Sequence, residues 1–160
     1  MKPILITLSL LSSITLFSQK LIEKYIDEGI AYHDAGEYEL AVEAYQHALY
    51  LNDSSSLAHY EIGMTYMYMK EYEKSLKHVN IVIALNDGSL LPAYLTKGNC
   101  LDALGRSEEA LKSYEFALKN LGEDYLLYYN LALTHYNLGN LDKAEGALIK
   151  WNQHQFKSFQ

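Results

Sequence analysis

The chemistry open to this chain depends first on its histidines, its cysteine and its acidic residues. Six histidines are present, namely His33, His47, His59, His78, His135 and His154. None of them forms a known metal-ligand signature with another histidine, a cysteine or an acid three or four residues away. The sequence also lacks an HExxH motif, paired CxxC motifs, an EF-hand loop, a P-loop and a GxSxG motif. We therefore expect no catalytic residue, no metal and no cofactor, and we interpret the chain as a non-enzyme.

Two further residues with reactive side chains are better explained by packing. Cys100 is the only cysteine, so no internal disulfide can form. It lies within a helical pattern, where a small buried thiol is expected rather than a nucleophile. His135 occupies a position at which Tyr66 stands earlier in the chain, which favours a packed side chain over a metal ligand.

The elements that hold these side chains follow a repeated pattern, which is clearest in residues 29–48. Gly29 would let a neighbouring helix come close, and Gly36 can adopt the positive φ that ends a helix. The Gly29 position returns as Gly63, Gly98 and Ala132, after 34, 35 and 34 residues. A constant period in this range indicates a stack of similar helical hairpins, because no single hairpin can bury its own apolar face.

Residue types and spacing together resemble the tetratricopeptide repeat (TPR) family. The residues of the first repeat that match the family pattern are Tyr25, Gly29, Tyr32, Gly36, Tyr38, Ala41, Tyr45 and Ala48. The resemblance covers roughly residues 22–155 and implies an all-α fold, an α-solenoid of four helix-turn-helix repeats forming a right-handed superhelix. Helix A of each repeat would line a concave groove, with helix B outside. The TPR domain is placed at residues 19–160, with repeats at about 22–55, 56–89, 91–124 and 125–158.

The turn signals within this frame predict eight helices. Their expected bounds are about 22–35, 38–51, 56–69, 72–85, 91–104, 107–121, 125–138 and 141–155. Clusters of Asn, Asp, Ser and Gly separate the repeats. Lys70 stands where the first repeat has Gly36, so the left-handed turn is less favourable in the second repeat.

The resemblance also indicates which helix A residues face the groove. They are mostly apolar or aromatic, with methionines in the middle, and Asn99 could hydrogen-bond a backbone. The predicted groove residues are Ile26, Ile30, Tyr60, Met64, Met67, Tyr68, Leu95, Asn99, Tyr129, Leu133 and Tyr136. Such a surface suits an extended segment or an amphipathic helix. The alternative is that several of these residues only pack between adjacent A helices.

One variant of the family is disfavoured. Carboxylate-clamp members, which bind chaperone tails, place Lys, Asn and Arg in the groove. The corresponding positions here include Ile26, Ile30 and Met64. A free C-terminal carboxylate would therefore find no cationic partner. We predict a non-catalytic module that binds a protein or peptide segment and acts as an adaptor, scaffold or assembly factor.

The N-terminus differs in kind from the repeats. Lys2 precedes an uncharged, mostly apolar run over residues 4–17, and Ser18 and Gln19 follow. This pattern is typical of a secretory signal peptide, here residues 1–18, so we expect a periplasmic or secreted protein. The run is shorter than the ~20 apolar residues of a membrane span. The alternatives are an uncleaved anchor and a buried first helix.

Charge narrows the range of partners. The formal net charge is −7, and removal of residues 1–18 takes away Lys2 and no acid, which leaves −8. An acidic chain without a basic cluster is not expected to bind nucleic acid or anionic membranes.

The C-terminus permits two interpretations. Trp151 stands where the earlier repeats carry Ala48, Val82 and Ala117. In the favoured interpretation, the last helix caps the array and the terminal aromatics, including Phe156 and Phe159, fold over its final seam. Alternatively, an open apolar end pairs with another copy, which would make the chain a self-associating structural protein.

Overall fold

The computed structural model describes residues 2–88 and 90–157, with side-chain surroundings for residues 15–88 and 90–155. The described residues form eight α-helices and no strand, as the sequence predicts. The helices are α1 (Lys2–Asp34), α2 (Tyr38–Leu51), α3 (Ser56–Tyr68), α4 (Tyr72–Leu85), α5 (Leu90–Ala103), α6 (Ser107–Asn120), α7 (Tyr125–Asn137) and α8 (Leu141–Lys157).

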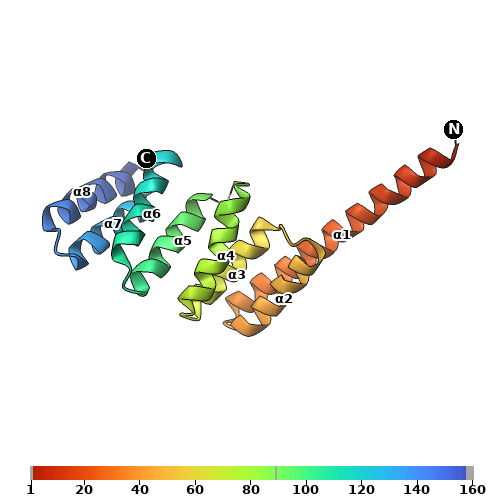
Figure 1. Cartoon of the computed structure of the whole chain (residues 1–160), viewed down its shortest axis with the longest axis horizontal. Helices are drawn as coiled ribbons and strands as arrows, with labels where there is room; N and C mark the ends of the chain where they lie inside the picture. Colours follow the sequence, from red (N-terminus) through yellow and green to blue (C-terminus); the bar gives the residue numbers. More distant parts are fainter. Residues whose placement is uncertain (1, 89, 158–160) are drawn as a thin grey trace.

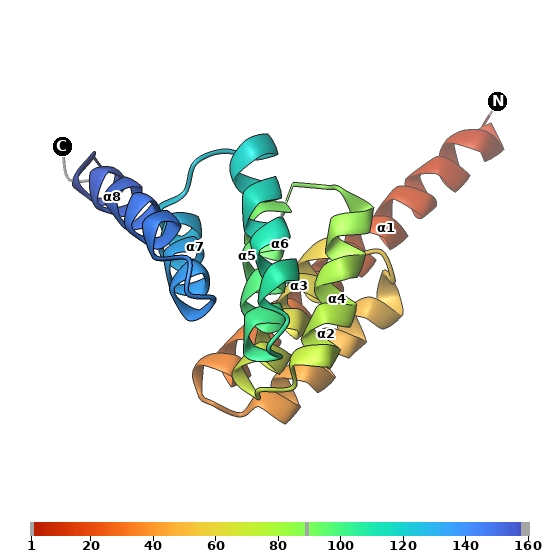
Figure 2. The ribbon, with the colours of Figure 1, turned by 60° about the vertical axis from the view of Figure 1, so that its left-hand side comes forward.

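Seven helices begin and end within two residues of their expected bounds, and α1 is the exception. It was expected to begin near Ile22 but is one continuous helix from Lys2. The sequence explains the difference, because no proline or glycine stands between Pro3 and Gly29 to interrupt the helix. Figures 1 and 2 show the first half of α1 projecting beyond the other helices. The part of the chain that the structure describes has no helix that is both long and apolar enough to cross a membrane.

Consecutive helices pair as four antiparallel hairpins, which follow one another along the molecule (Figure 1). We call α1, α3, α5 and α7 the A helices, and α2, α4, α6 and α8 the B helices. Each A helix also contacts the next A helix, whereas no two B helices contact each other within the described residues. The A helices therefore lie closer together than the B helices do.

The turn inside each hairpin requires a left-handed residue. Gly36 has φ 79°, and the N–H of Glu37 then donates to the carbonyl of Tyr32 at 2.8 Å, which is the Schellman arrangement of a helix end. Lys70 adopts the same conformation with φ 61°, and Glu71 makes the equivalent 2.8 Å bond to Tyr66. A side chain in this region costs roughly 1 kcal/mol, as expected for the non-glycine turn.

In two of the hairpins, a glycine of the A helix lies directly against a tyrosine of the B helix. The Tyr45 ring of α2 packs on Gly29 of α1, and the Tyr114 ring of α6 packs on Gly98 of α5. A Cβ atom at either glycine would overlap the ring. Both tyrosines are almost completely buried and belong to the two apolar cores. The close approach predicted for Gly29 is therefore confirmed.

Cys100 and His135 are buried, as their sequence positions predict. The Cys100 thiol lies 3.2 Å from the Ser75 hydroxyl, which itself donates to the Gly63 carbonyl at 2.7 Å. Burial raises the pKa of the Cys100 thiol. A buried thiol with a raised pKa is a poor nucleophile, so the residue has a packing role.

Replacing Gly98 by alanine tests the glycine–tyrosine contact. The added methyl group overlaps the Tyr114 ring, so we expect Gly98→Ala to lower the free energy of unfolding by about 1–3 kcal/mol. Gly146→Ala is the matched control, because nothing lies within 4 Å of a Cβ there. It lies in the interior of α8, where alanine should stabilise by about 0.5–1 kcal/mol. Urea unfolding measures both changes, and equal effects at the two positions would contradict the proposed role of the glycine–tyrosine contact.

Candidate interaction surface

The predicted groove residues lie on the A helices, on the side where consecutive A helices meet. We call this surface the A-helix face. Tyr68, Leu133 and Tyr136 are its most exposed members, with 54%, 48% and 65% of their surfaces exposed. Ile30 and Tyr129 are also exposed. The half-buried members are Tyr60, Met64, Met67, Leu95 and Asn99.

Ile26 does not belong to the accessible set. Only 6% of its surface is exposed, and it packs in the core cluster that includes Tyr45 of α2 and Ile62 of α3. The family resemblance assigned it to the groove as the fifth residue of its repeat. That helix covers Ile26, so the residue belongs to the seam between the first two hairpins.

The half-buried residues contribute to contacts between neighbouring A helices. The Thr96 hydroxyl lies 3.3 Å from the Met64 sulfur, which links α5 to α3. Tyr60 also reaches Thr96, and burial raises the pKa of the Tyr60 hydroxyl while the hydrogen bond to Thr96 lowers it. These side chains therefore join the hairpins and present only part of their surface to a partner.

Two hydrogen bonds that the sequence analysis missed join successive A helices at the same repeat positions. His33 Nδ1 lies 3.0 Å from Thr65 Oγ1, and Thr134 Oγ1 lies 2.5 Å from Asp102 Oδ2 and 2.7 Å from the Asn130 carbonyl, which share its single proton. Thr65 already donates to a carbonyl at 2.8 Å, so His33 acts as the donor through its Nδ1–H. Aligning the repeats places His33 with Asp102 and Thr65 with Thr134, which is the sequence signal for both bonds.

The Tyr114 hydroxyl reaches this polar seam from the B helix. It lies 2.9 Å from Asn99 Oδ1 and 3.2 Å from Asp102 Oδ2. Burial and the Asp102 charge raise the pKa of Tyr114, so the hydroxyl keeps its proton. Because the Asn99 oxygen accepts this bond, its NH₂ group is the part available to a partner backbone.

An aromatic cluster lies where the first two hairpins meet. The His33 ring is 5.3 Å from the Tyr38 ring and 4.9 Å from the Tyr68 ring, and the two tyrosines stack at 6.1 Å. Tyr68 remains more than half exposed. It is therefore an aromatic side chain that is held in place yet accessible.

The last hairpin leaves the apolar stripe of α7 uncovered. Its residues are Leu126, Tyr129, Leu133 and Tyr136. The Trp151 ring of α8 packs against Tyr129 at 5.8 Å, as expected if the end of the chain covers part of the final seam. The side chains of Phe156 and Phe159 lie outside the described residues.

One repeat position distinguishes α8 from the other B helices. Val42, Leu76 and Leu111 are buried at this position, where α8 carries the exposed Glu145.

Fold and seam geometry together define a helical-repeat protein built from α-hairpins. The tetratricopeptide repeat family is matched at residues 25–55 and again at residues 95–150. The chain belongs to the tetratricopeptide repeat family, as the residue pattern predicts.

Among curated proteins, the chain is similar to TPR repeat-containing protein MJ1428 of Methanocaldococcus jannaschii. The two are 26% identical over 125 residues, which is 78% of this chain and 22% of that protein. It is also 27% identical over 109 residues to BBSome complex member BBS4 of Bos taurus, covering 68% and 21% of the two chains. The chain thus spans about a fifth of the length of these relatives.

Two solved structures illustrate the fold. The crystal structure of MamA superposes with a TM-score of 0.79 and 22% identity, covering 92% of this chain and 85% of that one. The second TPR domain of human RPAP3, solved in complex with an HSP70 peptide, superposes with a TM-score of 0.66 and 24% identity. The match covers 73% of this chain and 97% of that one. At these sequence identities the two structures show that the fold is similar and nothing more.

A histidine pair between α3 and α4 was also missed by the sequence analysis. His59 Nδ1 and His78 Nδ1 are 3.0 Å apart, and His59 Nε2 donates to the Asp53 carbonyl at 3.1 Å. With its proton on Nε2, His59 accepts from His78 Nδ1–H. Burial, followed by His59 and Lys77, lowers the pKa of His78 from 6.5 to about 4. The two histidines are 19 residues apart in the sequence, so no local motif indicates that they pair. Within the described residues, no group of three or more His, Cys, Asp or Glu could hold a metal ion.

The low pKa of His78 predicts that acid destabilises the fold. Between pH 6.5 and 4 the unfolded chain binds this proton and the folded chain does not, so stability is present above pH 6.5 and is lost as the pH falls. We expect a loss of up to about 3 kcal/mol from this group. Urea unfolding at pH 7, 5.5 and 4.5 should show a smaller loss for His78→Gln than for the wild type. Asn80→Gln, a neutral exchange on an exposed part of α4, should lose stability with falling pH as the wild type does. If His78→Gln also loses as much stability as the wild type, His78 is not the cause of the acid destabilisation.

Proposed function

We propose that the chain is a non-catalytic protein-interaction module that binds a polypeptide segment along the A-helix face. It would serve as an adaptor, scaffold or assembly factor. The observation that carries this proposal is the set of exposed apolar and aromatic residues on α1, α3 and α7, of which Tyr68, Leu133 and Tyr136 are the most accessible. Accessible apolar surface shared by several elements usually has a partner.

The arrangement of the hairpins supports this surface as the binding face. Because A helices contact one another and B helices do not, the A side is the inner side of any curvature. In a right-handed superhelix this side would form a concave groove. Such a groove would hold an extended segment or an amphipathic helix by its apolar side chains, with the Asn99 NH₂ group bonding its backbone.

The residue types define the class of segment. Ile30 and Met64 stand at groove positions where carboxylate-clamp proteins carry polar or basic groups. The RPAP3 domain shares the fold and was solved with a bound peptide, which supports peptide binding in general. We propose a segment with alternating or helically spaced apolar residues, recognised internally and without its C-terminal carboxylate.

We further propose that the protein is exported, with residues 1–18 as a signal peptide cleaved after Ser18. The support is the pattern of Lys2, an uncharged apolar run and the small residue Ser18 before the cut, although Leu16 stands where a second small residue is preferred. The mature chain would then act in the periplasm or outside the cell. Mass spectrometry of the protein from its native envelope identifies its N-terminus, and a mature chain beginning at Met1 would contradict this proposal.

A second candidate function is self-association through the last hairpin. It is favoured by Leu148 and Ile149 of α8, which are exposed on a helix that contacts only α7 within the described residues. Sedimentation velocity over a wide concentration range tests it. A monomer at every concentration excludes this candidate and leaves the binding module.

Charge placed on the A-helix face should weaken peptide binding. The segment would be selected from a displayed peptide library against the intact chain, and its affinity measured by fluorescence anisotropy. Leu133→Lys with Tyr136→Lys replaces two exposed anchors, so we expect binding to weaken about 100-fold, as for loss of apolar hot spots. Circular dichroism should be unchanged, because both residues are accessible.

Tyr50→Lys is the matched control. Tyr50 is the most exposed aromatic residue among those described, and it lies on a B helix. This variant should bind the selected peptide as the wild type does. If the peptide binds equally to all three proteins, the A-helix face is not the binding surface.

A further inference from the structure

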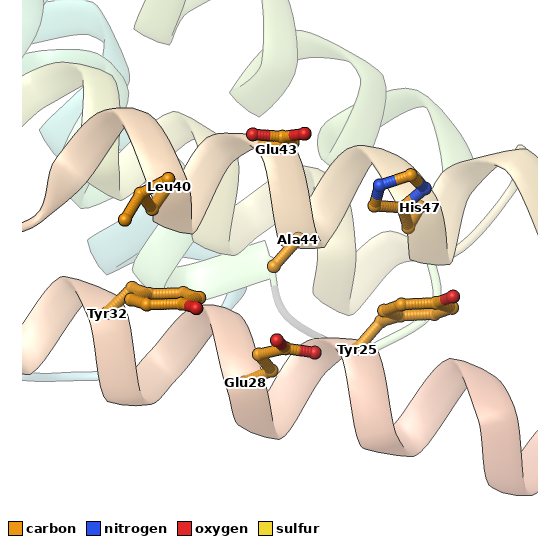
Figure 3. A pocket seen from close by; sticks show the side chains of 7 residues that line it. All are labelled: Tyr25, Glu28, Tyr32, Leu40, Glu43, Ala44 and His47. Carbon is orange, nitrogen blue, oxygen red and sulfur yellow. The ribbon is translucent and has the colours of Figure 1, made fainter.

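A small cavity lies between α1 and α2, apart from the A-helix face. It has a volume of about 240 Å³. Figure 3 shows Tyr25, Glu28 and Tyr32 projecting from α1, with the two rings on either side of the carboxylate. The remaining lining residues come from α2 and are Leu40, Glu43, Ala44 and His47.

The residue at the repeat position of Glu28 differs between hairpins. The second and fourth hairpins carry Ile62 and Leu131 there, which are buried in cores shared with the preceding B helix. Glu28 of the first hairpin is exposed. Within the described residues, neither Glu28 nor Glu43 forms an ion pair or a hydrogen bond. The two carboxylates are therefore available to a ligand.

A second cavity of about 300 Å³ occupies the same place in the third hairpin. Tyr94 and Phe116 stack at 4.6 Å and 28° there, as Tyr25 and His47 stack at 5.1 Å and 28° in the first hairpin. The charged positions are reversed. Lys97 stands at the Glu28 position and Lys112 at the Glu43 position. The first cavity thus carries two acids, whereas the third-hairpin cavity carries two bases and Glu109, with Leu101 in place of Tyr32.

We propose that the cavity of the first hairpin binds an arginine side chain of a partner polypeptide. Two carboxylates beside two tyrosine rings match a planar guanidinium, which donates hydrogen bonds in its plane and stacks on aromatic faces. One of the two rings has a cation near its face, since Lys24 Nζ lies 6.0 Å from the centroid of Tyr25. A quaternary ammonium group has no N–H to donate, so the carboxylates would add little to its binding.

This inference goes beyond the proposed function, because the cavity is formed by α1 and α2 alone. It assigns a second contact to the acidic chain, in the first hairpin and outside the apolar A-helix face. A basic residue held there would fix the position of a bound partner along the stack.

Titration with small cations tests the site directly. The probe is acetyl-Gly-Arg-Gly-amide at up to about 10 mM, the range for a few charge-assisted contacts, and the readout is the backbone amide shifts of the full chain. We expect the largest shifts around Glu28 and Ala44. The lysine tripeptide should bind more weakly, and tetramethylammonium more weakly still. No shifts at this cavity, or equal binding of all three cations, would overturn the proposal.

Charge exchange provides the matched variants. Glu28→Lys with Glu43→Lys reproduces the charges of the third hairpin and should weaken arginine binding at least about tenfold. Lys97→Glu with Lys112→Glu makes the opposite change in the third hairpin, so it should leave the first site intact and add a second set of shifts near Ser113. Unchanged binding in the first variant would refute the proposal.

Two controls separate this site from folding and from the A-helix face. Circular dichroism reports whether the lysine variant folds, and Glu28→Gln with Glu43→Gln removes the charges while keeping the side-chain shape. It should also lose arginine binding, and retained binding would contradict the site. Leu133→Lys with Tyr136→Lys should bind arginine normally, so failure of either site is recognised independently of the other.

Discussion

The packing of a tyrosine ring directly on a glycine is the contact on which the rest of the array depends. Tyr45 crosses α1 at Gly29, and Tyr114 crosses α5 at Gly98. Close approach of the two backbones allows the phenol to pass between the helices and reach the far side. At the third hairpin its hydroxyl ends beside Asn99 and Asp102. The apolar contact of Tyr114 with Gly98 within the hairpin thereby places the tyrosine hydroxyl among the polar groups between neighbouring hairpins.

The joints between A helices combine apolar packing with a few placed hydrogen bonds. His33 with Thr65, and Asp102 with Thr134, occupy equivalent positions in the first and third joints. A directed bond fixes the register of one hairpin on the next, which apolar packing alone specifies less sharply. The A-helix face lies beside these bonds. The surface proposed for binding is therefore the part of the A helices that the contacts between hairpins leave exposed.

Local features were predictable from the sequence, and features that need two hairpins were not. Apart from the start of α1, helix ends follow from glycine, asparagine and helical spacing, and even the Lys70 turn is identified by its repeat position. Ile26 was misassigned because its exposure depends on how closely α3 packs, which no residue type reports. The His59–His78 pair depends on the crossing of α3 and α4. The reversal of charge between Glu28 and Lys97 is visible once the repeats are aligned, but the cavity around it is not.

The glycine–tyrosine contact is not present in every hairpin, and this has a consequence for cooperativity. The second hairpin has Gly63 against Val79, and the fourth has Ala132 and Leu148 at those positions, with Leu148 exposed. In a linear array each unit is stabilised by its own contacts and by its neighbours. Within the described residues the fourth hairpin contacts only the third, and it carries Gly146 within α8. Melting should accordingly begin in the fourth hairpin, with the first and third hairpins persisting as the last ordered segments.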